Sequence, residues 1–244
     1  TMANAGSDFE TCIDSGTFQI IGLPNGGFWS GNGITLSGFF TPSNQDTIDL
    51  VYTYGSGNCT NRDTINVIVN PLPNLDVGLD FEVCIDDTLQ VLSANLLGGT
   101  WYGNGIINPS GIFDPQLAGS GIHDLYYYYK DSNTCDIVDT LKATVYDLPL
   151  VIANDTSICN SLIPVSLQGF PLGGNWIDSN ITPNGIYSPD GTGVFKIYYD
   201  YTDVNSCYNI DSMILTVNSL VISDAGNNIE ACVDTGLIQL SGSP

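Results

Sequence analysis

The sequence predicts an all-β chain of tandem immunoglobulin-like β-sandwich domains. Four cysteines, Cys12, Cys84, Cys159 and Cys232, recur at intervals of 72, 75 and 73 residues. A repeat of this length is too long for a solenoid unit and long enough for a small independent domain. Short runs that alternate apolar and polar residues, bounded by Gly, Pro, Asn and Asp, are typical of antiparallel sandwiches of about seven strands.

The repeat also predicts the domain organisation. Three further cysteines, Cys59, Cys135 and Cys207, follow the first three by 47, 51 and 48 residues, so each full repeat has an early and a late cysteine. We expect domains over residues 1–73, 74–149 and 150–220, and the start of a truncated fourth over 221–244. Short Pro-containing junctions favour an extended rod, because Pro fixes φ and restricts the residue before it. The pattern indicates a segment of a longer array.

The repeats share one order of elements, except that the third has Asp178-Ser179-Asn180 where the first two have a Gly-Asn-Gly turn. In the first repeat an alternating run at 18–20 is followed by a glycine pair at 26–27, then by Trp29 and a Gly-Asn-Gly turn at 31–33. Alternating runs at 49–54 and 65–69, on either side of Cys59, complete the predicted strands. One face of 49–54 carries Leu50, Tyr52 and Tyr54, which we interpret as core.

The tryptophans occupy one position per repeat, at Trp29, Trp101 and Trp176. A buried tryptophan is usual in immunoglobulin-like sandwiches, and this register predicts three core tryptophans. The alternative is that they form sugar-stacking platforms of a carbohydrate-binding array.

The cysteines predict an oxidising compartment and not a metal site, since the sequence has no CxxC or Cys/His cluster. We expect one disulfide per domain, in which the early and late cysteines of a repeat share one end of the sandwich. The predicted pairs are Cys12–Cys59, Cys84–Cys135 and Cys159–Cys207, with Cys232 paired beyond Pro244. Each closed loop would stabilise its domain by about 4 kcal/mol in the chain-entropy model.

The charge is strongly negative, with 26 acidic against 4 basic residues and a net charge of −22. This excludes nucleic-acid binding and docking on bare anionic lipid, both of which need a basic surface. Acid-rich turns near the late cysteines suggest calcium ligands: Asp131, Asn133, Asp136, Asp200, Asp203 and Asn205. The first repeat has only Gly55-Ser56-Gly57-Asn58 there, so Asx-rich turns are the preferred interpretation. We expect no metal and no cofactor.

The sequence gives no grouping of base, nucleophile and orienting residue, and we expect no catalytic residues and no enzyme activity. Its one histidine, His123, has counterparts near Ile48 and Lys196 in the other repeats and is expected on an exposed strand surface. Neither a signal peptide nor an apolar run long enough to span a membrane is present.

The strings Trp101-Tyr-Gly-Asn-Gly-Ile and Gly111-Ile-Phe-Asp-Pro-Gln-Leu-Ala-Gly119, followed by Tyr126 to Tyr129 and Cys135, resemble the PKD-like or immunoglobulin-like repeats of giant Bacteroidota surface proteins. These proteins include gliding-motility adhesins exported by the type IX secretion system. The resemblance covers all three repeats and the start of the fourth. It implies an extracellular, cell-surface location, a filamentous shape and no intrinsic chemistry.

The resemblance also suggests glycosylation. Triplets of Asp, a hydroxyl residue and an aliphatic residue open the last strand of each repeat, and they resemble Bacteroidota O-glycosylation acceptors. The candidate hydroxyl residues are Thr64, Thr140 and Ser212, with Thr47 and Thr88 in matching triplets elsewhere. The alternative is a turn-capping Asp followed by a β-favouring residue.

We therefore expect a structural or adhesive stalk segment of a large secreted adhesin or filament. The expected partners are neighbouring repeats of the same chain, export and surface-attachment machinery, and surface glycans, without direct membrane insertion. Two alternatives stay open: a repeat array that binds glycan or matrix ligands, and the accessory stalk of a secreted hydrolase.

Overall fold

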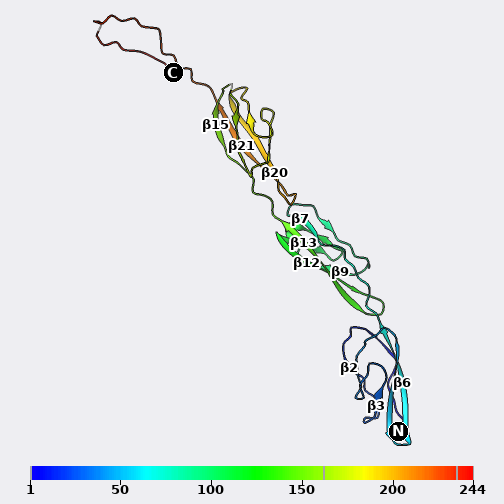
Figure 1. The fold of residues 1–244 in the computed structure, drawn as a ribbon. Coiled ribbons are helices and arrows are strands. Elements are labelled where there is room, and N and C mark those ends of the chain that lie inside the picture. The colour runs from blue at the N-terminus through cyan, green and yellow to red at the C-terminus, as the bar shows by residue number, and fades with distance from the viewer. Residues whose placement is uncertain (1, 162, 235, 244) are drawn as a thin grey trace. The chain divides into compact units, whose positions relative to one another are not determined.

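The computed structural model describes residues 2–161, 163–234 and 236–243. The chain forms two compact units, Thr1–Val145 and Tyr146–Pro244. The first unit contains two hydrophobic cores and the second contains one, so each of the three full repeats has a core of its own. Strands dominate all three repeats (Figure 1).

The first repeat consists of one four-stranded sheet and a facing pair of short strands. Its strands are β1 (Phe9–Cys12), β2 (Phe18–Gln19), β3 (Phe28–Ser30), β4 (Phe39–Phe40), β5 (Thr47–Ser56) and β6 (Cys59–Asn70). The sheet has the order β1-β6-β5-β3, and β2 pairs with β4. β1 runs parallel to β6, whereas β5 is antiparallel to both β6 and β3.

The second repeat has the same sheet order, β7-β13-β12-β9, opposite the smaller sheet β10-β11-β8. Its elements are β7 (Phe81–Cys84), β8 (Gln90–Val91), β9 (Thr100–Tyr102), β10 (Ile106–Asn108), β11 (Ile112–Phe113), α1 (Pro115–Ala118), β12 (Gly121–Lys130) and β13 (Asp136–Tyr146). α1 is a single turn that the sequence did not predict. Asp114 caps it by accepting hydrogen bonds from the backbone N–H groups of Gln116 and Leu117.

The third repeat lies in the second unit and repeats this sheet as β15-β21-β20-β18. Its strands are β14 (Ile152–Ala153), β15 (Thr156–Cys159), β16 (Val165–Ser166), β17 (Gly169–Phe170), β18 (Asn175–Ile177), β19 (Ile186–Tyr187), β20 (Gly193–Thr202) and β21 (Tyr208–Asn218). Two short pairs, β14 with β17 and β16 with β19, form the facing layer.

The sheet order confirms the prediction of all-β, immunoglobulin-like sandwiches. The third, fifth and sixth strands of the first repeat form the C-F-G arrangement of that fold, with the tryptophan on the C-type strand β3. β5 alternates buried and exposed residues over Ile48, Leu50 and Tyr52, as a strand with one face on a core requires.

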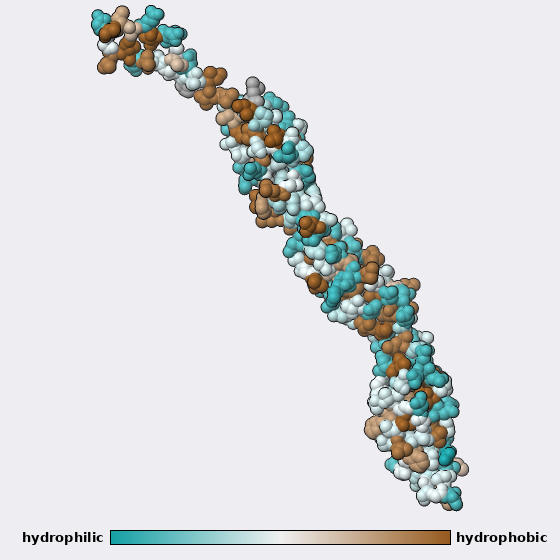
Figure 2. Space-filling model, viewed as in Figure 1, coloured by the Kyte–Doolittle hydropathy of each residue, from teal (hydrophilic) through white to brown (hydrophobic). Residues whose placement is uncertain are grey.

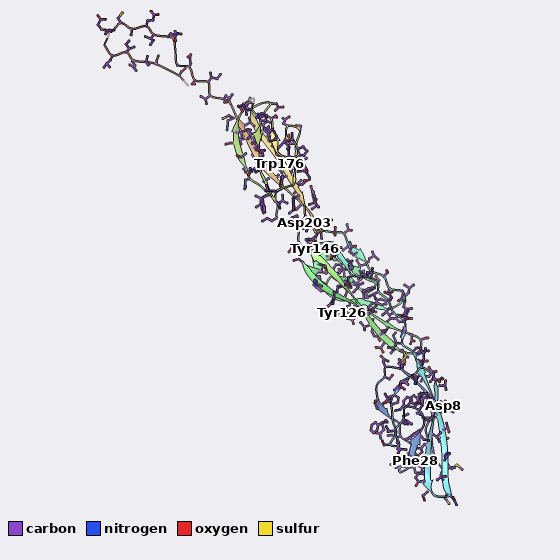
Figure 3. The ribbon with its side chains drawn as sticks, in the orientation of Figure 1. Asp8, Phe28, Tyr126, Tyr146, Trp176 and Asp203 are labelled. Carbon is purple, nitrogen blue, oxygen red and sulfur yellow. A yellow bond between two sulfur atoms is a disulfide. The ribbon has the colours of Figure 1, made fainter. Side chains whose placement is uncertain are left out.

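All three tryptophans are buried, with exposed fractions of 3%, 3% and 5%. Each packs against a tyrosine of the next long strand, with ring centroids about 5 Å apart: Trp29–Tyr52, Trp101–Tyr127 and Trp176–Tyr199. Figure 3 labels Trp176 in the third repeat. This burial leaves no exposed ring face for stacking on a sugar.

The core tyrosine explains the second glycine of the pair that precedes each tryptophan. Tyr127 accepts a hydrogen bond from the Gly99 N–H and donates one to the Leu96 carbonyl, both at 2.8 Å. A Cβ on Gly99 would overlap the Tyr127 ring and the Tyr128 carbonyl oxygen. The turn therefore needs glycine there because its backbone approaches the core tyrosine directly.

Residues 221–234 and 236–243, where we predicted the start of a fourth domain, are exposed throughout. One isolated bridge joins Asp224 to Ser243. Apolar side chains such as Val221, Ile222 and Val233 are open to solvent. Figure 2 shows hydrophobic side chains, in brown, on the surface of the segment at the end that Figure 1 marks C.

Candidate functional site

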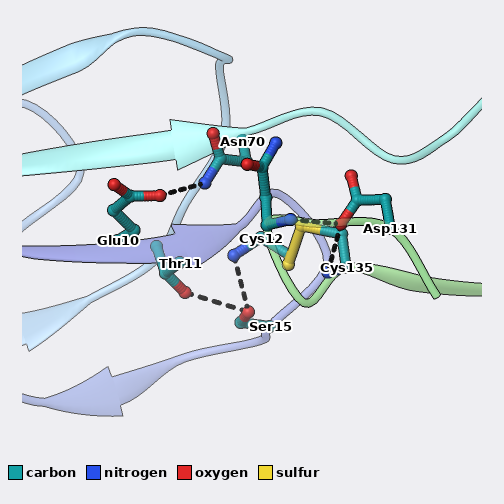
Figure 4. Close-up of a disulfide and its surroundings, with 8 residues drawn as sticks. Glu10, Thr11, Cys12, Ser15, Asn70, Asp131 and Cys135 are labelled. Atoms are coloured by element: carbon teal, nitrogen blue, oxygen red, sulfur yellow. Dashed lines mark hydrogen bonds between the residues drawn. A yellow bond between two sulfur atoms is a disulfide. The ribbon is translucent and has the colours of Figure 1, made fainter.

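The most distinctive feature of the first unit is a disulfide between its two repeats. Cys12 of the first repeat is bonded to Cys135 of the second, with 5.5 Å between their Cα atoms (Figure 4). The predicted pairs Cys12–Cys59 and Cys84–Cys135 are therefore wrong. The predicted arrangement of one disulfide within each domain fails for this pair, because the bond joins consecutive repeats.

The parallel pairing of β1 with β6 explains the error. Cys12 is in register with Asn70 at the end of β6, whereas Cys59 is the first residue of the same strand. A strand of 12 residues spans about 35 Å, and a disulfide needs Cα atoms within about 7 Å. The early and late cysteines of the first repeat thus lie at opposite ends of the sandwich.

The turn that carries Cys135 is organised by one carboxylate. Asp131 Oδ1 accepts hydrogen bonds from the backbone N–H groups of Asn133 and Cys135, at 2.9 and 2.8 Å. Thr134 has a positive φ of 67°, and its N–H donates to the Asp131 carbonyl oxygen. This Asx turn places Cys135, which is fully buried, where it meets Cys12.

The third repeat contains the same turn. Asp203 Oδ1 accepts from the N–H groups of Asn205 and Cys207 at 2.9 and 2.8 Å, and Ser206 has a φ of 69°. Figure 3 labels Asp203. These contacts give Asp131 and Asp203 a structural role in their turns.

Among the residues that the structure describes, no group of three or more His, Cys, Asp or Glu side chains could hold a metal ion.

The remaining calcium candidates have separate roles or positions. Asp200 accepts a hydrogen bond from the Asn175 side chain at 3.2 Å. Asp136 is exposed at the start of β13, in register with Lys130 across the hairpin. The hydrogen bonds of the Asp131 and Asp203 turns are those of the Asx-turn interpretation.

The other half of the disulfide lies in a turn at the end of β1. The Cys12 N–H donates to Ser15 Oγ at 3.1 Å, and the Ser15 N–H donates to the Cys12 carbonyl at 3.1 Å. Thr11 Oγ1 donates to the same Ser15 hydroxyl at 2.9 Å, and Asn70 donates to Glu10 at 3.0 Å (Figure 4). These bonds hold the Cys12 backbone in place beside Asn70.

The remaining cysteines differ in state. Cys84 and Cys207 are disulfide-bonded, whereas Cys59 and Cys159 are free thiols on exposed residues. The predicted pair Cys159–Cys207 is therefore also wrong. The expectation that Cys232 pairs beyond Pro244 stays a prediction.

The hydroxyl residues proposed for glycosylation are accessible in the structure. Thr64, Thr140, Thr47 and Thr88 are exposed, and Ser212 is half-buried. In the last-strand triplets the preceding Asp has a structural use: Asp63 accepts a hydrogen bond from the Ala5 N–H at 2.7 Å, and Asp211 from the Ala153 N–H at 2.9 Å. The recurrence of Asp thus has a cause independent of any sugar.

His123 is half-buried, not on an open strand surface as expected. Its Nε2 lies 2.8 Å from the Gly119 carbonyl oxygen, and Asn104 Nδ2 lies 3.3 Å from its Nδ1. The ring therefore fastens the loop after α1 to β12.

The side chain of Lys142 forms an exposed cross-strand ion pair with Asp124, with 2.7 Å between Nζ and Oδ1. This carboxylate raises the pKa of Lys142, whereas a catalytic lysine needs a lowered pKa. No helix among the described residues is long and apolar enough to cross a membrane.

Comparison with known proteins adds little to this geometry. No family model and no curated protein matches the chain. An I-band fragment of titin is 10% identical, covers 90% of this chain and 97% of its own, and gives a TM-score of 0.38. Sidekick-1 immunoglobulin domains 1–5 are 15% identical over 88% of this chain and 58% of theirs, with a TM-score of 0.28. The insect immune protein hemolin is 12% identical over 90% and 75%, with a TM-score of 0.30.

Proposed function

We propose that this chain is a structural stalk segment of a large secreted cell-surface adhesin or filament, and that it performs no catalysis. The observation that carries the proposal is the disulfide from Cys12 to Cys135, which joins two consecutive repeats covalently. A bond at this place links the end of β1 in one repeat to the turn before β13 in the next, and so constrains the junction between the two domains. A constrained junction suits a protein that bears mechanical load or holds other domains at a fixed distance.

Three further features support this function. Disulfides persist in oxidising compartments, which agrees with display outside the cell. The net charge of −22 keeps neighbouring stalks soluble and apart. The Asp, Trp and Tyr side chains that recur in register are used in hydrogen bonds or cores, so what the repeats share is architecture.

Surface labelling in the native host tests the proposal. Antibodies raised against this segment should bind intact cells, and external protease should remove the epitope without lysis. Binding only after permeabilisation would contradict a surface location. As a test of the spacer role, in-frame removal of one repeat period from the full-length protein should weaken attachment more than charge-neutral substitutions at exposed positions.

The binding alternative predicts a different result. If the repeats hold glycan or matrix ligands, the purified chain should bind surface polysaccharide from its host with saturation. A stalk should show no saturable binding in the same titration. The gliding-motility and type IX secretion assignments belong to this proposal, and the full-length sequence would test them by its export signal.

A further inference from the structure

The end of β15 in the third repeat reproduces the end of β1 in the first. Cys159 is in parallel register with Asn218, the last residue of β21, as Cys12 is with Asn70, the last residue of β6. The next N–H group donates to that asparagine carbonyl in both repeats, from Ile13 at 3.0 Å and from Asn160 at 2.7 Å. Cys12 is bonded at this position, and Cys159 is an exposed thiol.

Cys59 stands in the complementary position. It begins β6 after a tight hairpin turn and pairs with Ser56, whereas its counterpart Cys135 precedes β13 and is bonded to Cys12. In the first-repeat hairpin, Gly55 occupies the place that Asp131 has in the second repeat, and both Gly55 and Gly57 have positive φ. This hairpin therefore lacks the carboxylate that organises the Cys135 turn. Cys59 is exposed, so its thiol is accessible to a partner.

We propose that Cys159 and Cys59 are the two open halves of the inter-repeat junction seen between Cys12 and Cys135. Cys159 binds the late-cysteine hairpin of another repeat of this class, and Cys59 binds the early-cysteine turn of another. The partner is thus a β-sandwich repeat that presents the complementary cysteine end. This inference rests on the proposed stalk function in one respect: it assumes that further repeats of the array come close to Cys59 and Cys159.

The covalent step requires an oxidant, which we assign to a small-molecule or protein disulfide. The Cys59 thiolate attacks a sulfur of the oxidant disulfide, forms a mixed disulfide and releases one thiol. The Cys159 thiolate of the partner then attacks the Cys59 sulfur and releases the second thiol. The two cysteines lose two protons and two electrons, and the oxidant disulfide is reduced to two thiols.

A second copy of the chain serves as the probe. C59S and C159S are each prepared in a C232S background, so that Cys159 is the reporter thiol of one variant and Cys59 that of the other. The two are mixed at high concentration with oxidised glutathione in about 0.15 M salt, which screens their mutual repulsion. The mixture should form a disulfide-linked dimer that peptide mapping assigns to Cys59–Cys159.

Each variant alone provides the matched control. We expect no dimer when either variant is incubated alone, because two copies that both present Cys59, or both present Cys159, lack the complementary cysteine. Equal amounts of Cys59–Cys59 or Cys159–Cys159 dimer would show random collision of exposed thiols and would overturn the proposal. Failure of the mixture to dimerise would overturn it too. Neither outcome would change the result of surface labelling, which tests the stalk function separately.

Discussion

Asp139 binds the start of its own repeat: its Oδ2 accepts a hydrogen bond from the backbone N–H of Val77, 62 residues earlier, at 3.2 Å. Its Oδ1 accepts from the Thr140 N–H at 2.8 Å. The carboxylate therefore fastens the first buried residue of the sandwich to the last strand. The same bond recurs in the first and third repeats, which makes it a property of the domain.

Replacing Asp139 by Ala should destabilise the second repeat. The change leaves the N–H of the buried Val77 without its acceptor, and a hydrogen bond to a charged group contributes about 1.5–3 kcal/mol. Urea unfolding followed by tryptophan fluorescence measures the loss. Asp136→Ala is the matched control, because that exposed Asp precedes Asp139 by three residues and should change stability little.

Glycosylation of the triplets stays a prediction. Protein from the native host should carry added mass on peptides that contain Thr64, Thr140 and Ser212, with Thr47 and Thr88 as further candidates. Modification is expected first at the exposed threonines, since Ser212 is half-buried. Intact-mass spectrometry checks this, and a mass equal to the polypeptide less the hydrogens lost to disulfides would contradict it.

Peptide mapping of this isolated chain without reduction should give a Cys12–Cys135 peptide, with Cys59 and Cys159 alkylated as free thiols. A dominant Cys12–Cys59 peptide would contradict the structure.

Cys135→Ser should lower the stability of the first unit. A closed loop of 123 residues is worth at most about 5 kcal/mol in the chain-entropy model. Thermal unfolding of C135S measures the effect. C59S, which removes a free thiol at the matching position of the first repeat, should melt like the native chain.

Tyr187→Phe should be neutral or stabilising. The Tyr187 side chain is 1% exposed, and its hydroxyl has no hydrogen-bond partner in the described structure. Burial raises the pKa of this phenol, which reflects the same desolvation. Phe113 fills the equivalent core position in the second repeat, so Phe113→Tyr should cost about 1–3 kcal/mol by burying an unpaired hydroxyl. Calorimetry of both variants tests the pair.

The sequence predicted the sandwich well, because its signals are local or periodic. The register of Trp29, Trp101 and Trp176 indicated burial, and alternation over residues 49–54 indicated a strand with one buried face. The single turn α1 escaped prediction because four residues are too few for a helical period, and Pro115 has counterparts at Pro42 and Pro189 in repeats that form no helix there. Only the Asp114 cap is particular to the second repeat.

The disulfide pairing could not be predicted from spacing alone. We assumed that Cys12 and Cys59 share an end of the sandwich, which would hold if the cysteine-bearing first strand met the start of the last strand. The parallel pairing of β1 with β6 reverses this and places Cys12 beside Asn70. An Asp four residues before the late cysteine, at Asp131 and again at Asp203, was a sequence signal for the turn that carries this cysteine. In both repeats the Asp carboxylate accepts a hydrogen bond from the backbone N–H of the cysteine.

The Cys12–Cys135 bond also determines how the first unit responds to tension. When the two ends of the chain are pulled apart, the load passes from Cys12 through the two sulfur atoms to Cys135 and bypasses the residues between them. The bypassed segment, which contains β5, β6 and β12, represents about 430 Å of contour length at about 3.5 Å per residue. An intact bond withholds that length from extension even if both sandwiches unfold. Because Cys84 lies within the bypassed segment and is itself disulfide-bonded, the full length is released only when both bonds are reduced, so the redox state of the cysteines sets the maximum reach of the segment.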